Sequence, residues 1–121
     1  MPIILMSMGI GVEITVEQEG DIHLVTIEGR VDAATTPIVE KKLAKLLDIS
    51  KKIAIDCSNI DYLSSAGMRL LLSMTKKMHA AKKKLAFFGM SDDVMEIIRM
   101  AGFERILKIF STKKEALKSF D

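Results

Sequence analysis

Residues 53–72 read Ile53-Ala-Ile-Asp-Cys-Ser-Asn-Ile-Asp-Tyr-Leu-Ser-Ser-Ala-Gly-Met-Arg-Leu-Leu-Leu72. The first five residues have the length and β-branched content of a strand that is buried on both faces. A polar segment, residues 58–61, follows and is predicted to be a connection. Small and apolar residues then recur every three or four positions as far as about Lys82, which predicts a helix with one buried face: Gly67, Leu71, Met74, Met78 and Ala81.

Ser64 and Ser65 fall at the predicted start of this helix. Serine is a preferred N-cap because its hydroxyl accepts a hydrogen bond from a free backbone N–H of the first turn. In α/β sheets, sites form where a strand ends and a helix begins, and the positive end of the helix attracts anions. The small residues Ala66 and Gly67 leave both hydroxyls uncovered. Each serine is therefore a candidate cap and a candidate phosphate acceptor.

The rest of the chain predicts a single α/β domain over residues 12–121. The other expected strands are residues 12–17, 22–28, 85–88 and 106–110, and the other helices begin at Thr36, at residues 91–93 and at Thr112. The first two strands are joined by a tight turn at residues 19–21, which is typical of a hairpin. The order ββαβαβαβα predicts a mixed sheet, with an N-terminal hairpin followed by parallel strands and about four helices.

Composition limits the classes of function. The chain has 121 residues, 49% of them hydrophobic, and a net charge of +2, which is too balanced to indicate a nucleic-acid partner. Residues 1–11 carry no charge and are too short to span a bilayer, so we expect an N-terminal lead or edge segment and no membrane insertion. The single cysteine, Cys57, lies in the predicted buried strand and cannot form an internal disulfide. We therefore expect a cytoplasmic protein.

Catalytic and cofactor motifs are weak. The sequence contains no Walker loop, no glycine-rich dinucleotide turn and no cluster of metal-binding side chains, so no cofactor and no metal are expected. Ser65 and Gly67 form half of a nucleophile elbow, but Leu63 stands where the first glycine would be. His79 follows Ser65 by fourteen residues, about 21 Å along the helix, which is too far for it to act as the base. The other histidine, His23, is only a remote candidate for that role. A serine-nucleophile enzyme is thus a remote alternative, and we expect a protein that is not an enzyme.

A second motif lies between the first hairpin and the first helix. It reads Gly29-Arg-Val-Asp-Ala-Ala-Thr-Thr-Pro37, and Asp32 at its centre is either a turn former or a site residue. Together with residues 56–72, it resembles the motifs of the STAS domain family, and more narrowly of the bacterial anti-sigma factor antagonists. The resemblance extends over about residues 12–120. It implies that Ser65 is the phosphorylation site. Ser64 stands where the best-known members carry Asp and is the alternative acceptor.

The resemblance also implies a function. The unmodified protein would sequester an anti-sigma factor, typically a serine kinase of the ATP-binding histidine-kinase-like type, and so free a sigma factor for transcription. Phosphorylation would end this binding, and a serine phosphatase would restore it. The implied partner-binding residues are Asp32, Ser64, Ser65, Ala66, Gly67 and Met68. The main alternative is a STAS accessory subunit or scaffold of a transporter or stress-signalling complex that works without phosphorylation.

Overall fold

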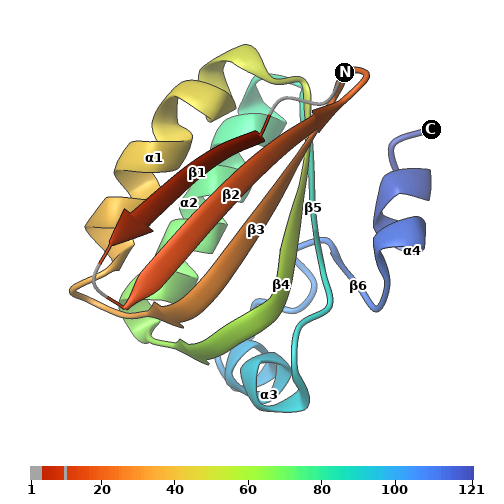
Figure 1. The fold of residues 1–121 in the computed structure, drawn as a ribbon. Coiled ribbons are helices and arrows are strands. Elements are labelled where there is room, and N and C mark those ends of the chain that lie inside the picture. The colour runs from red at the N-terminus through yellow and green to blue at the C-terminus, as the bar shows by residue number, and fades with distance from the viewer. Residues whose placement is uncertain (1–3, 10) are drawn as a thin grey trace.

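The computed structural model describes residues 4–9 and 11–121, and within them six strands form one mixed sheet (Figure 1). The strands lie in the order β1 (Ile4–Gly9), β2 (Val12–Glu19), β3 (Ile22–Val31), β4 (Lys52–Leu63), β5 (Lys84–Phe88) and β6 (Ile109–Phe110). Pairing is antiparallel from β1 to β3 and parallel from β3 to β6. The helices are α1 (Thr36–Ile49), α2 (Ser65–Ala80), α3 (Asp92–Met100) and α4 (Lys113–Lys118).

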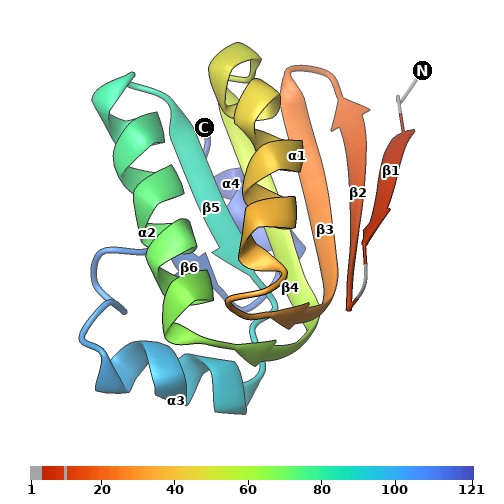
Figure 2. The same ribbon diagram turned by 90° about the vertical axis from the view of Figure 1, so that its left-hand side faces the viewer.

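The helices cover the sheet unequally. Helices α1 and α2 lie side by side on one face, α4 lies behind the sheet, and α3 lies at the end where α2 begins (Figure 2). The main core lies between the sheet and the α1–α2 layer, where Val25, Ile55 and Phe87 are fully buried. A smaller core lies under α4 and contains Ala54, Ala86, Phe88, Ala116 and Phe120. Successive residues of β4 and β5 thus point alternately into the main core and into the smaller core, as expected for strands buried on both faces.

The predicted fold class and the order ββαβαβαβα are confirmed over residues 12–121. The hairpin turn is also correct, because Gly20 and Asp21 join β2 to β3 and Gly20 has a φ of 61°. The structure adds β1, which pairs with β2 at the edge of the sheet. The prediction for residues 1–11 therefore falls partly on this strand, while residues 1–3 and 10 lie outside the described residues.

The polar segment 58–61 was predicted to be a connection, and this was wrong. The strand β4 continues through it to Leu63, with Asn59 paired to Glu28 and Ile60 paired to Gly29. Two register shifts between β3 and β4 break the alternation of buried and exposed residues. Because a strand is recognised in a sequence by alternating apolar and polar residues, the part of β4 beyond the first register shift could not be recognised.

Other element boundaries also differ from the sequence prediction: β2 and β3 extend to Glu19 and Val31, past the expected ends at residues 17 and 28, and β5 begins at Lys84. The last strand was expected over residues 106–110, but β6 contains only its last two residues. Helix α2 ends at Ala80, two residues earlier than expected, and the cap position of α1 is Thr35, not Thr36. Among the described residues, the helices are all too short or too polar to cross a membrane.

Candidate functional site

The candidate site lies where the end of β3 meets the start of α2. The backbone N–H of Ser64 donates to the carbonyl oxygen of Val31 over 2.9 Å. Gly67 makes this approach possible, because a Cβ at that position would lie 2.5 Å from the same oxygen and 2.8 Å from a methyl carbon of Leu63. Asp32 follows Val31 directly, so the two sequence motifs lie next to each other in space.

Ser64 is the N-cap of α2. Its backbone is extended, with φ −84° and ψ 174°, and its hydroxyl accepts from the backbone N–H of Gly67 over 3.2 Å. This is the standard way in which a serine satisfies a free donor of the first turn. The Ser64 side chain is half-buried and already has a structural partner.

Ser65 is the first residue of α2 and is exposed. Within the described part of the chain, no hydrogen bond engages its hydroxyl, in contrast to that of Ser64. The first intrahelical bond of α2 runs from Met68 N–H to the Ser64 carbonyl, so the N–H groups of Ser65 and Ala66 precede the regular ladder. An anion on Ser65 would meet these donors and the positive end of the helix.

The Asp32 carboxylate organises the turn before α1. One of its oxygens, Oδ1, accepts from the backbone N–H groups of Ala34 and Thr35, each at 3.0 Å. The other oxygen, Oδ2, lies 3.5 Å from Nε of Arg30. The Thr35 N–H, helped by the Ala34 N–H, the Thr35 hydroxyl and Arg30, holds the pKa of Asp32 below its usual value. Asp32 therefore has the contacts of a turn former, and its side chain is still 27% exposed.

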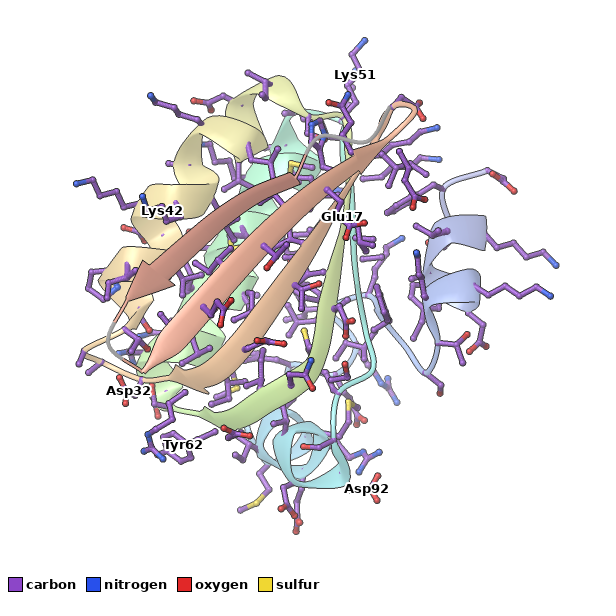
Figure 3. All side chains as sticks on the ribbon, in the orientation of Figure 1. Glu17, Asp32, Lys42, Lys51, Tyr62 and Asp92 are labelled. Carbon is purple, nitrogen blue, oxygen red and sulfur yellow. The ribbon has the colours of Figure 1, made fainter. Side chains whose placement is uncertain are left out.

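An aromatic and cationic pair beside Asp32 was not predicted from the sequence. The Arg30 guanidinium lies over the ring of Tyr62, 4.6 Å from its centroid, and Tyr62 is 40% exposed. Figure 3 shows Asp32 and Tyr62 at the same corner of the molecule. Arg30 and Tyr62 face each other because β3 and β4 pair there after the second register shift. The sequence shows that Arg30 and Asp32 are two residues apart. It does not show the register between β3 and β4 that places Tyr62 beside Arg30.

The six residues that the resemblance implies for partner binding divide into two groups. Asp32, Ser64, Ser65 and Ala66 are at least partly exposed around the start of α2. Gly67 and Met68 are buried, and Met68 is only 7% exposed within the main core. The structure therefore places these last two residues where they support the start of α2 from inside.

Both histidines lie far from Ser65. His79 follows Ser65 by fourteen residues on α2, about 21 Å along the helix axis. His23 precedes Val31 by eight residues on β3, which is about 26 Å along the strand. The Nδ1 atom of His23 lies 2.7 Å from the hydroxyl oxygen of Ser50, at the opposite end of the sheet from the candidate site. Neither imidazole is placed to act as a base for Ser65.

Residues 13–116 match the family model of the STAS domain, so the chain belongs to the STAS domain family. Among curated relatives, an anti-sigma-B factor antagonist of Listeria monocytogenes is 26% identical over 110 residues, covering 89% of this chain and 95% of the relative. The anti-sigma-F factor antagonist RsfB of Mycobacterium tuberculosis is 23% identical over 113 residues, covering 93% of this chain and 92% of the relative.

Solved structures show the same fold. An anti-sigma factor antagonist from Mycobacterium paratuberculosis superposes with a TM-score of 0.83 at 20% identity, covering 93% of this chain and 97% of that one. The Bacillus cell fate determinant SpoIIAA, solved in its phosphorylated form, superposes with a TM-score of 0.65 at 12% identity and covers 98% of this chain and 100% of its own. That structure shows the same fold in a protein that is phosphorylated.

Proposed function

We propose that this chain is an anti-sigma factor antagonist, a binding module that sequesters an anti-sigma factor and so frees a sigma factor in the cytoplasm. The names of its curated relatives support this proposal, because they share most of their length with the chain. The alternative of a transporter subunit or unphosphorylated scaffold is not favoured by those names. We further propose that the chain acts by binding and not by catalysis, since Ser65 has no histidine near it.

One observation supports Ser65 as the switch: two adjacent serines have different structural roles. The Ser64 hydroxyl is held by the Gly67 N–H as the cap of α2, whereas the Ser65 hydroxyl is exposed. A kinase can reach Ser65 without breaking the cap. Asp and Ser are both strong N-caps, so a serine at position 64, where the best-known members carry Asp, keeps the start of the helix intact. Ser64 is therefore the weaker candidate acceptor.

A phosphate on Ser65 adds about −1.5 to −2 charges at the start of α2. The positive end of the helix and its free N–H groups favour this charge, so the fold should tolerate it. The partner surface that we propose consists of Asp32, Ser64, Ser65 and Ala66. In that interface the same charge would have to lose its hydration and would repel acidic groups of the partner. The switch would thus act on binding and leave folding intact.

The proposed partner is a serine kinase of the ATP-binding histidine-kinase-like type that also binds a sigma factor. It would use Ser65 as its substrate, and a serine phosphatase would reverse the reaction. The exposed pair of Arg30 and Tyr62 beside Asp32 extends the proposed surface. Tyr and Arg are enriched at protein interfaces, and this supports the assignment of the corner as the partner-binding face.

The test uses each kinase-type anti-sigma factor encoded in the source genome, purified and mixed with this protein. We expect one of them to bind the unmodified protein, to phosphorylate it with ATP at Ser65 alone, and to release it afterwards. Mass spectrometry locates the phosphate, and a binding titration follows the release. The Ser65→Ala variant should bind without becoming phosphorylated, while Ser73→Ala, exposed on the same helix, should behave like the parent. Phosphate on Ser64 or on the Ser65→Ala variant, or no binding to any of these kinases, would contradict the proposal.

A further inference from the structure

A cavity of about 500 Å³ lies at the other end of α2 from Ser65. Its walls come from the last turns of α2, the start of β5, the segment around β6 and the end of α4: Thr75, Lys76, Met78, His79, Lys83, Lys84, Leu85, Ile106, Lys108, Phe110, Ser119 and Phe120. Small-molecule sites commonly have volumes of about 300–1,000 Å³. We call this space the α2–α4 cavity.

The short strand β6 explains why the cavity is there. Strand β5 spans five residues, but β6 pairs only with its last two, Phe87 and Phe88. On that side, Lys84, Leu85 and Ala86 have no strand partner within the described chain. Helix α2 covers one face of this open edge and α4 lies on the other face (Figure 2). The fold thus leaves a space beside β5 that neither helix fills.

The lining of the α2–α4 cavity combines apolar walls with cations. Met78, Leu85 and Phe120 provide buried apolar surface, and Ile106 is 46% exposed. Four lysines and His79 also line the cavity, and none of the lining residues is an aspartate or a glutamate. An apolar body with an anionic head would match both features.

Two of the four lysines already have partners. The Lys83 ammonium donates to the carbonyl oxygens of Leu47 and Asp48 at 2.8 and 2.7 Å, and the Lys84 ammonium donates to that of Phe120 at 3.0 Å. The Lys83 bonds join the segment before β5 to the end of α1, and the Lys84 bond joins the start of β5 to the segment that follows α4. Lys76 and Lys108 are exposed, and the ion pairs found between described residues include neither. These two cations are therefore available to a ligand.

We propose that the α2–α4 cavity binds an amphipathic anion, with its apolar chain against Met78, Leu85 and Phe120 and its anionic head between Lys76 and Lys108. Lys76 follows Ser65 by eleven residues, about 16 Å along α2. The site is thus separate from the proposed phosphorylation site at Ser65 and does not depend on the proposed function. The chain would then bind a small molecule in addition to its proposed protein partner.

The test is a calorimetric titration of the full chain with decanoate, below the concentration at which it forms micelles. The matched neutral probe is 1-decanol, and inorganic phosphate tests the anionic head alone. We expect saturable decanoate binding, with amide NMR shifts confined to residues 75–79, 83–86, 106–110 and 119–120. The neutral alcohol and phosphate should each bind more weakly than decanoate, because each offers only half of the matching chemistry.

Variants locate the anionic head. Lys76→Ala combined with Lys108→Ala should weaken decanoate binding about tenfold, as expected from the loss of two exposed charge contacts. Lys41→Ala combined with Lys42→Ala makes the same change in net charge on exposed positions of α1, where Lys42 points away from the molecule (Figure 3), and should leave the affinity unchanged.

Equal affinity in both double variants, no decanoate binding, or NMR shifts outside the cavity would overturn the proposal. Co-sedimentation with phosphatidylglycerol vesicles in place of decanoate binding would also overturn it, since the cations would then serve a membrane surface.

Discussion

The Ser64 N–H and the Val31 carbonyl oxygen form a 2.9 Å hydrogen bond that joins the start of α2 to the end of β3. The residues that follow these two in the chain are Ser65 and Asp32, so the bond places both motif residues at one corner. The same oxygen would be 2.5 Å from a Cβ at position 67. Gly67 is therefore needed because of a close backbone approach and not because of its own dihedral angles.

The first prediction follows from this contact. Gly67→Ala should lower the free energy of unfolding by about 1–3 kcal/mol, because α2 must move away from Val31 to admit the methyl group. Urea unfolding followed by circular dichroism measures the change. Ser73→Ala, exposed on the same helix, is the control and should stay within about 0.5 kcal/mol of the parent. A Gly67→Ala variant as stable as this control would show that the approach of α2 to β3 is not tight.

The second prediction separates the two serines by stability. Ser64→Ala removes the hydroxyl that accepts from Gly67 N–H and should cost about 1 kcal/mol, the usual effect of losing an N-cap. Ser65→Ala removes an exposed hydroxyl and should change stability by less than about 0.5 kcal/mol. Both are measured in the same urea titration. Equal losses in the two variants would mean that the hydroxyls share the capping role.

Much of the fold could be predicted because several local signals agree. The caps Ser91 and Thr112 accept from the backbone N–H groups of Val94 and Glu115, and these are the positions at which the sequence predicted helix starts. The run 53–57 was recognisable because helices cover both faces of the sheet there, so that all of its residues except Asp56 are apolar and buried. Ser64 as a cap could likewise be predicted from residue type and position.

The remainder depends on contacts between distant segments. The partnership of Arg30 with Tyr62 exists only because two register shifts align those residues across β3 and β4. The sequence also does not reveal that β6 stops after two residues, and this is the feature that opens the α2–α4 cavity. The sequence predicted either a turn role or a binding role for Asp32, and the structure shows the hydrogen bonds of the turn role.

The third prediction concerns pH and His23. Burial lowers the pKa of His23 below its ordinary value of 6.5, so the unfolded chain takes up a proton first as the pH falls. The contribution of the neutral imidazole to stability is therefore complete above pH 6.5. It decreases as the pH falls below that value, until the folded protein is protonated as well.

The measurement is the free energy of unfolding by urea titration at several pH values between 7.5 and 5, a range that includes the ordinary pKa of histidine. The parent should lose stability toward the acidic end. His23→Gln cannot take up a proton and should show a smaller loss over the same range, even if its stability at pH 7.5 is lower because the contact with Ser50 has changed. Parallel curves for the parent and the variant would contradict this account of His23.

The last prediction tests how the proposed switch acts. Ser65→Glu places a negative charge at the first residue of α2, where the helix field favours it by about 0.3–1 kcal/mol, so the domain should remain folded and should melt no earlier than the parent. Ser65→Gln has nearly the same shape without the charge and is the matched control. In a titration with the anti-sigma partner, Glu should weaken binding more than Gln does, because desolvating an ionised carboxylate in the interface costs much more than desolvating a neutral amide. The effect should be weaker than that of phosphate, which carries more charge and more acceptor oxygens.

Equal weakening of binding by Glu and Gln would mean that side-chain size causes the loss. A Ser65→Glu protein that melts well below Ser65→Gln would mean that the switch works through the fold.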